Sequence, residues 1–352
     1  MKDKIDMASI TTESFHPDRI EARLSETLSR ASHDAVKASL LTLIIVHNKE
    51  NNSAVENLLD GLFGKRPLRI IRVESGFNTP TSIDVSARCF SGLMRGGICF
   101  EEIIVYNGPD KKGLDPGLWT PLILRDIPAA VFWFDKTACL PAVMKQADHF
   151  VDVCIVDSGE LEKMGELPQD FFSFLYSYFI EEQKKERRVP LVDMGWRRIL
   201  PLRQSTALLF DQDNLTPSLK EIESVSLNGF SESDMLLYTG WLAQQLEWRF
   251  VQRNGHEMIF ITRDNNKIAV TTGKKTKAPH SVVITCRKTG SFSITCVDDH
   301  IAELTSPGTT NPHVMCKQND SEHILHEIDT LHTDPLFYKI IEKINTFRII
   351  EK

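Results

Sequence analysis

The stretch LLTLIIVH (40–47) decides the fold of the first half of this chain. It is a continuous run of apolar and β-branched residues, which is typical of a strand covered on both faces of its sheet. Apolar residues at helical spacing precede it over 17–39, and Ser53 and Glu56 after it have the spacing of a capping box that begins a second helix. The next apolar run, LRIIRVES (68–75), follows that helix, so the pattern predicts a right-handed crossover between two parallel strands.

Four more strand patterns extend the predicted sheet. SIDVSARCF (82–90) and ICFEEIIVY (98–106) flank the glycine-containing segment SGLMRGG and predict a hairpin. AAVFWF (129–134) and VDVCIVDSG (151–159) are apolar runs with a helical segment between them. This alternation predicts an α/β layered domain with a mixed, mostly parallel sheet and helices.

The charge run EEQKKERR (181–188) is the predicted domain boundary. Beyond it, after two apolar helices, apolar residues alternate with period two over 256–300, which predicts an antiparallel meander, and 321–348 predicts a closing helical region. The second domain is therefore predicted to be α+β. We expect an α/β domain at 1–188 and an α+β domain at 189–352.

Composition narrows the class of partner. The 352 residues contain 41% hydrophobic and 25% charged residues, which are ordinary values for folded domains. A net charge of −7 argues against nucleic acid as the main partner, because phosphate binding needs a basic field. We find no signal-peptide pattern and no apolar run of about 20 residues, so we expect no membrane contact. The seven cysteines have no C-x-x-C spacing, and we predict a reduced, cytoplasmic protein with free thiols.

Motifs for a cofactor or a metal are missing from the sequence. The first strand is followed by NKENNS, without the glycines that let a backbone approach a dinucleotide. His323 and His326 are spaced as a pair on a helix, but a metal site needs three or four convergent ligands. Glu101 and Glu102 are neighbours in a strand and should point to opposite faces, so they do not predict an acid–base pair. We therefore expect no cofactor, no metal and no catalytic residue.

One alternative places a ligand pocket at the strand ends. Asp157 and Ser158 follow a buried strand, at the carboxyl end where open α/β sheets hold ligands, and Asp126 precedes the neighbouring strand. These residues would serve an enzyme or sensor that binds a sugar phosphate or a nucleotide. The other interpretation is that Asp157 and Ser158 cap the segment that follows.

The segment DMGWRRILPLRQ (193–204) offers a recognition surface. Arginine forks can pair with carboxylates and tryptophan supplies a large rigid contact, and both residue types are enriched at the centres of protein interfaces. The candidate partner-binding residues are Asp193, Trp196, Arg198 and Arg203. The alternative is that an Asp–Arg pair in this segment ties the two domains together.

The order of these segments resembles the OpcA family, the glucose-6-phosphate dehydrogenase assembly proteins. DMGWRRILPLRQSTALLFD is similar to that family's D-x-x-W-x-R motif and the apolar helix after it. ARCFSGLMRGGICFEEIIVYNG, LWTPLILRDIPAAVFWF, ADHFVDVCIVDSG and MLLYTGWLAQQLEW resemble further family segments in the same order. The chain departs from the pattern at Leu202 and Phe134, where the family has tryptophan, and at Phe100, where it has glycine.

The resemblance implies a non-catalytic allosteric activator. Such a protein binds glucose-6-phosphate dehydrogenase, favours its active oligomer and supports the oxidative pentose phosphate pathway of carbohydrate metabolism. Asp193, Trp196, Arg198 and Arg203 then form either the contact with the dehydrogenase or the frame that holds it. A scaffold for some other protein is a further alternative.

Overall fold

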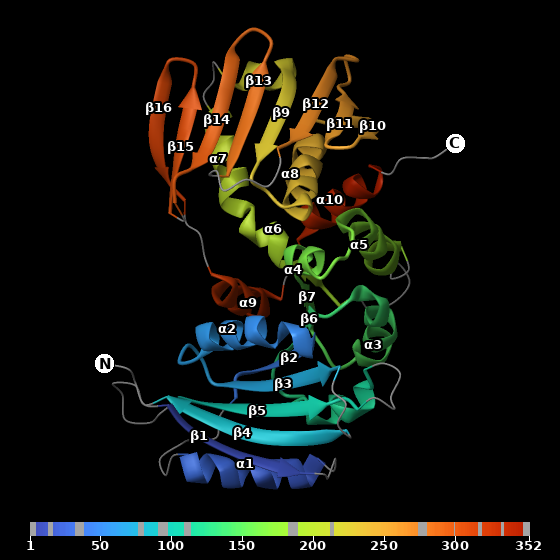
Figure 1. Ribbon diagram of the computed structural model, residues 1–352, viewed down its shortest axis with the longest axis vertical. Coiled ribbons are helices and arrows are strands. Elements are labelled where there is room, and N and C mark those ends of the chain that lie inside the picture. The colour runs from blue at the N-terminus through green and yellow to red at the C-terminus, as the bar shows by residue number, and fades with distance from the viewer. Residues whose placement is uncertain are drawn as a thin grey trace. The chain divides into compact units, whose positions relative to one another are not determined.

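Two compact units make up the chain. The computed structural model describes residues 5–12, 17–31, 39–76, 81–90, 98–108, 114–181, 189–211, 215–273, 280–298, 300–315, 319–331 and 334–347 (Figure 1). Unit 1 is Met1–Asp157, Arg187–Val192 and Asn319–Thr333, and unit 2 is Ser158–Glu186, Asp193–Gln318 and Asp334–Lys352. The boundary at residue 188 stays a prediction.

Unit 1 is built on a mixed, mostly parallel sheet, as predicted. The central strands β2, β3, β6 and β7 and their neighbour β5 pair in parallel, while β4 pairs antiparallel with β5 and β1. The strand order is β1 (Ile5–Thr12), β4 (Ser82–Phe90), β5 (Ile98–Tyr106), β3 (Leu68–Ser75), β2 (Leu41–Asn48), β6 (Ala129–Phe134), β7 (Val153–Val156) and β8 (Leu191–Asp193).

Helices cover this sheet on both faces. They are α1 (Pro17–Ala31), α2 (Asn52–Leu62), α3 (Leu140–Ala147) and α9 (Asp320–Thr330). Glu101, on β5, pairs with Arg69, which also binds Glu21 of α1, whereas the neighbouring Glu102 pairs with Arg72, which binds Glu56 of α2. Because adjacent strand residues point to opposite faces, α1 and α2 lie on opposite sides of the sheet.

The predicted capping box at the start of α2 is wrong. The helix begins at Asn52, before Ser53, and a 3₁₀ turn over Lys49–Asn51 leads into it, with the Asn48 side chain accepting from the Asn51 N–H. Glu56 does not reach back to the helix terminus, because its carboxylate pairs with the buried Arg72 guanidinium at 2.6 Å. A charge-assisted contact to a buried arginine is stronger than a solvent-exposed cap.

Unit 2 combines helices with an antiparallel-rich sheet, which confirms the α+β class. The strand order is β10 (Arg249–Asn254), β11 (Glu257–Ile261), β12 (Lys267–Thr272), β9 (Ile222–Asn228), β13 (Ser281–Cys286), β14 (Gly290–Cys296), β15 (Ile301–Ser306) and β16 (Thr309–Val314). The pair β9 and β12 is parallel, and the other pairs are antiparallel.

Apolar helix faces form the core of unit 2. Its helices are α4 (Ser158–Lys163), α5 (Pro168–Leu175), α6 (Met194–Arg198), α7 (Leu200–Phe210), α8 (Glu232–Gln245) and α10 (Pro335–Asn345). Helix α7 packs on β14 and β15, and α8 packs on α10. Phe210 of α7 lies 4.6 Å from Phe292 of β14, measured between ring centroids. In the part of the chain that the structure describes, no helix is both long and apolar enough to cross a membrane.

A disulfide corrects the prediction that all thiols are free. Cys89 of β4 and Cys99 of β5 face each other in register, and their sulfur atoms lie 2.11 Å apart. The sequence predicted the hairpin but not its register, which depends on the turn over 91–97, and that turn lies outside the described residues. Cys139, Cys154, Cys286 and Cys296 are free thiols. Burial raises the pKa of the Cys154 thiol to about 12, so this thiol is inert at neutral pH.

We expect the disulfide to stabilise the pairing of β4 with β5 in the unit 1 sheet. Its closed loop is short, with a sequence separation of 10 residues, and such a loop contributes about 2–3 kcal/mol to the free energy of unfolding. Dithiothreitol should therefore lower the unfolding midpoint in urea. The Cys89→Ser/Cys99→Ser variant should start at the lower midpoint and show no response to dithiothreitol. A variant that still responds would assign the effect to another thiol pair.

Candidate functional site

Asp193 fixes the start of the predicted recognition segment. It is the N-cap of α6 and fully buried, and its Oδ1 accepts hydrogen bonds from the Gly195 N–H at 3.0 Å and the Ser158 N–H at 2.9 Å. The carboxylate therefore joins the first residue of α4 to the first turn of α6. Both donors belong to helix starts, where backbone N–H groups have no partner within the helix.

Trp196 and Arg203 form a buried stack. The Arg203 guanidinium carbon lies 3.3 Å from the centroid of the Trp196 ring, and Nη2 donates to the Trp196 carbonyl at 3.3 Å. The indole Nε1 donates to Asp334 Oδ2 at 2.8 Å, and the ring packs on Phe337 of α10. A cation over a desolvated tryptophan face is a favourable electrostatic contact, so the stack holds α6, α7 and the start of α10 together.

Burial sets the charge state of this stack. It lowers the pKa of Arg203 to about 10, with the Asp334 charge opposing the shift and the Arg197 charge adding to it. The guanidinium still carries its charge at neutral pH. Asp193 binds backbone N–H groups and Arg203 binds the indole. The alternative of an Asp–Arg pair that ties the two domains together stays a prediction.

Arg198 differs from the other three candidates because it is partly exposed. It lies at the end of α6 and lines a cavity of about 200 Å³. The other lining residues are mostly apolar, with two aspartates and a histidine among them: Ile199, Pro201, Leu202, Phe230, Asp234, His280, Cys296, Asp298 and Met315. Of the four candidates in this segment, Asp193, Trp196 and Arg203 are buried and form a frame, whereas Arg198 is partly exposed.

We expect Asp193→Ala to be strongly destabilising. It removes the acceptor of two buried N–H groups, which should lower the free energy of unfolding by about 2–4 kcal/mol. Asp193→Asn keeps a neutral oxygen in place and should cost about 1 kcal/mol. Urea denaturation of both variants measures the difference. Equal losses would mean that hydrogen bonding to Oδ1 is not what this residue contributes.

The residues of the alternative ligand pocket are not brought together. Asp126 is exposed in the loop before β6, whereas Asp157 is buried directly after β7. Strands β6 and β7 are parallel, so Asp126 lies at the amino ends of the strands and Asp157 lies at their carboxyl ends. Ser158 is buried, its N–H is bound by Asp193, and its carbonyl accepts from the Ser233 hydroxyl at 3.0 Å. It therefore has a capping role.

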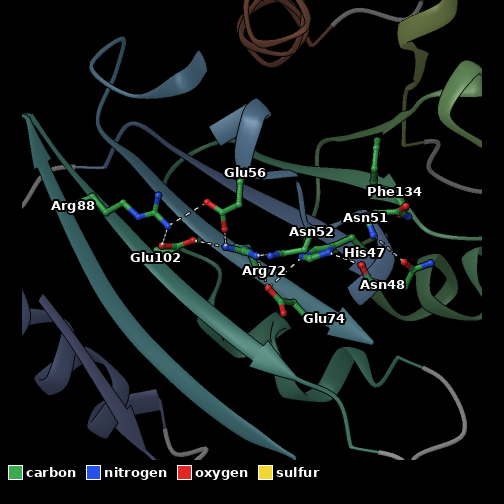
Figure 2. Close-up of polar contacts among 10 residues, drawn as sticks. All are labelled: His47, Asn48, Asn51, Asn52, Glu56, Arg72, Glu74, Arg88, Glu102 and Phe134. Carbon is green, nitrogen blue, oxygen red and sulfur yellow. Dashed lines mark hydrogen bonds and ion pairs between the residues drawn. The ribbon is translucent and has the colours of Figure 1, made fainter. Parts of the chain in front are cut away.

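Sequence reasoning missed a polar cluster at the carboxyl ends of β2, β3 and β6, of which Figure 2 labels Asn48, Asn51 and Phe134. The Asn48 amide donates to Asp135 Oδ1 at 3.3 Å, and the Ser75 hydroxyl donates to Asp135 Oδ2 at 3.1 Å. Asn51 donates to the Phe134 carbonyl at 3.1 Å. Parallel sheets usually hold their ligands at this edge. Here the chain's own side chains bind one another across the strand ends.

Arg72 is the centre of the charged part of this cluster (Figure 2). Its guanidinium lies 2.5 Å from the Glu74 carboxylate, 3.0 Å from Glu102 and 2.6 Å from Glu56. Arg88 lies 3.1 Å from Glu102 and so adds a second cation. Apart from Glu56 and Arg88, which are partly exposed, these side chains are almost fully buried. Each buried carboxylate thus has a cation as its partner, as burial requires.

His47 completes this ion network. It is fully buried, its Nε2 lies 3.3 Å from Glu74 Oε1, and its Nδ1 lies 3.0 Å from the Asn48 carbonyl. Burial of Glu74 works to raise its pKa, but the hydrogen bond with His47 and the charge of Arg72 outweigh burial and hold that pKa below its usual value. Glu74 is therefore ionised at neutral pH and serves as a structural anion.

Two domain families match the chain, and both describe a glucose-6-phosphate dehydrogenase subunit. Residues 60–169 match the family of the N-terminal domain of this subunit, and residues 189–341 match the family of its C-terminal domain. The chain belongs to the OpcA family. The motifs quoted from the sequence lie mostly within these two ranges.

Curated OpcA proteins of cyanobacteria are distant relatives of the chain. The OxPP cycle protein OpcA of Nostoc punctiforme is 26% identical over 230 residues, which cover 62% of this chain and 47% of the relative. The protein of the same name from Synechocystis is 25% identical over 153 residues, covering 43% of this chain and 30% of the relative. The chain thus matches less than half the length of each.

The fold is also similar to that of a solved oxidoreductase. A variant of KijD10, a 3-ketoreductase from Actinomadura kijaniata bound to NADP and TDP-benzene, superposes with a TM-score of 0.51. The match covers 87% of this chain and 94% of the other, at 10% sequence identity. At that identity the likeness concerns the fold alone.

Proposed function

We propose that this protein is a non-catalytic assembly factor that binds glucose-6-phosphate dehydrogenase and favours its active assembled form. The proposal rests on the match of both parts of the chain to the two domains described for a glucose-6-phosphate dehydrogenase subunit. Through this partner it would support the oxidative pentose phosphate pathway, as the name of the OpcA relatives suggests. The partly exposed Arg198, two residues after the buried Trp196, is our candidate for the contact.

The arrangement of the strand ends favours a binding role over an enzymatic one. Asn48, Ser75 and Asp135 bond to one another where a parallel sheet would otherwise hold a substrate or a nucleotide. The residues of the alternative pocket, Asp126 and Asp157, lie at opposite edges of the sheet. No observation on the described residues favours the alternative of a sugar-phosphate or nucleotide enzyme.

The mechanism that we propose is differential binding. An assembly factor that binds the active oligomer more tightly than the free enzyme shifts the population toward the active form. A tenfold change in apparent substrate affinity requires a difference of only about 1.4 kcal/mol between the two states. Contacts made by a few side chains are sufficient for such a difference.

Mixing the chain with its cognate dehydrogenase tests the proposal. We expect the KM for glucose 6-phosphate to fall about tenfold and the enzyme to shift to a larger oligomer, as measured by initial rates and by light scattering. Heat-denatured protein is the control for crowding by added protein. If neither KM, kcat nor the oligomeric state changes, the proposal is wrong, and a pull-down from lysate would then identify the partner of a scaffold.

A further inference from the structure

The two faces of the unit 2 sheet differ in burial and composition. On one face the side chains are buried and apolar, as for Val225, Ile284 and Phe292, and α7 packs there on β14 and β15. The alternate residues of the same strands are partly exposed. We call this second set the hydroxyl face. On the four central strands it consists of Lys267, Ala269 and Thr271 (β12), Ser224, Ser226 and Asn228 (β9), Ser281, Val283 and Thr285 (β13), and Ser291, Ser293 and Thr295 (β14).

The hydroxyl face is almost free of charge on these strands. Among the residues just named, only Lys267 is ionisable, and it lies at the start of β12. The exposed Glu223, at the irregular start of β9, is a second charged residue of these strands. A solvated face of an antiparallel sheet usually carries charged side chains, and this chain is rich in them, with 25% charged residues. The centre of a buried interface is depleted in charged residues, and the centre of this face shares that one feature.

Many of the hydroxyl groups already have partners within the sheet. Ser226 Oγ lies 3.1 Å from Thr271 Oγ1, and Thr285 Oγ1 lies 3.3 Å from Ser291 Oγ. The main cost of covering a polar surface is the loss of hydrogen bonds to water. Because one hydroxyl of each pair already donates to the other, covering the pair breaks fewer hydrogen bonds to water than covering two separate hydroxyls.

Exposed apolar residues extend the hydroxyl face at its far edge. Ile301 of β15 and Val314 of β16 are cross-strand partners, with 39% and 70% of their surface exposed. They alternate with Ala302 and Leu304, which are buried on the helix side, so they point to the hydroxyl face. Val283 lies in the middle of the same face. The surface therefore offers apolar anchors as well as neutral polar groups.

We infer that the hydroxyl face binds the same face of a second copy of this chain. In an isologous dimer, residues near the two-fold axis meet their own copies, so a charge at the centre would meet a like charge. The centre of this face is neutral and satisfies that condition. A partner of opposite charge would call for a charged patch, which these residues do not provide.

The size of the face fits a stable dimer. The whole face spans eight strands about 4.8 Å apart and about six residues long, which gives about 700 Å². Its outer part carries charged residues, with Glu257 of β11 opposite Thr271 and Glu303 of β15 opposite Thr295, so the neutral region is its centre. Two such faces would bury about 1,400 Å² together, which is within the range of about 1,200–2,000 Å² for specific interfaces. Small side chains also allow two sheets to approach to the usual packing distance of about 10 Å.

Sedimentation equilibrium of the full chain carrying Cys139→Ser tests the inference, since this substitution prevents links through the exposed Cys139 and leaves the Cys89–Cys99 disulfide intact. We expect a dimer at micromolar concentration. Val283→Lys places two like charges near the axis and should raise the dimer Kd at least 100-fold. Val283→Thr should leave the Kd unchanged. Ser29→Lys, on the exposed side of α1, is the matched control for added charge and should also leave the Kd unchanged.

Two further results complete the test. Circular dichroism verifies that Val283→Lys is folded; if it is not, Ile301→Lys at the exposed edge replaces it, with the same expected loss of dimer. A wild-type chain that is monomeric at 100 µM, or a dimer that tolerates the folded lysine variant, overturns the inference. If the wild type is monomeric and the lysine variant loses binding to the dehydrogenase, the hydroxyl face belongs to that partner instead.

Discussion

Arg72→Met should lower the free energy of unfolding by about 3–5 kcal/mol, because removing one partner of a buried ion network leaves uncompensated charges. Arg72 lies within 3.0 Å of three carboxylates, those of Glu74, Glu102 and Glu56. After its loss, Glu74 keeps the contact with His47, and Glu102 keeps Arg88 as a cation and the Ser86 hydroxyl as a hydrogen-bond donor. Methionine has a similar length and fills most of the space, so the loss measures charge and not volume.

The pH dependence of this loss separates the ionic cause from packing. The pKa of Glu74 is lower in the folded protein than its ordinary value of 4.5. A group with a depressed folded pKa contributes stability above its unfolded pKa, and that contribution is lost as the pH falls through the folded value. The difference between wild type and Arg72→Met should therefore shrink as the pH falls from 7 to below 4.5.

Urea denaturation at pH 7 and pH 4 measures this difference, with Arg72→Lys as the matched control. Lysine keeps the charge but cannot bind several carboxylates at once, so we expect an intermediate loss. A loss for Arg72→Met that is the same at both pH values would assign the effect to packing.

The strands that sequence could predict are those with a single strong pattern. LLTLIIVH and AAVFWF are almost entirely apolar, and they became β2 and β6 at the centre of the sheet, where both faces are covered. By contrast, IDMASITT, which forms β1, mixes polar and apolar residues and gave no prediction. Strand β9 was also missed, although it lies between β12 and β13. Its parallel pairing with β12 depends on contacts distant in sequence, which local periodicity does not report.

The candidate site was predicted by residue type but not by role. Trp196 and Arg203 were expected at a contact or in a frame, and sequence alone does not distinguish a stacked, buried arginine from an exposed one. The Arg72 network did leave a trace in the sequence. Arg69 and Arg72 interrupt an apolar run that became the buried strand β3, and a charge at such a position needs a buried partner. The two arginines predict that buried carboxylates pair with them. Sequence does not identify these carboxylates, because they come from β5 and from two helices.

Trp196→Ala should be the most damaging change in the recognition segment. Truncating a fully buried tryptophan costs about 3–5 kcal/mol. Here it also removes the surface on which Arg203 stacks and the donor that binds Asp334 at 2.8 Å. We expect a large fall in the unfolding midpoint and, at assay temperatures near that midpoint, loss of dehydrogenase activation in proportion to the unfolded fraction.

Arg198→Ala tests whether Arg198 contacts the dehydrogenase directly, as distinct from residues that only support the fold of this segment. Arg198 is partly exposed, so its replacement should change stability by less than about 0.5 kcal/mol. If it contacts the dehydrogenase, as we propose, the concentration for half-maximal activation should rise about tenfold or more, as expected for a central interface arginine. The decisive comparison is made well below both midpoints, where Trp196→Ala is folded. There Trp196→Ala should activate more effectively than Arg198→Ala, because the buried indole acts only by holding the segment. The reverse order would place the buried stack itself at the contact and would require the segment to open on binding.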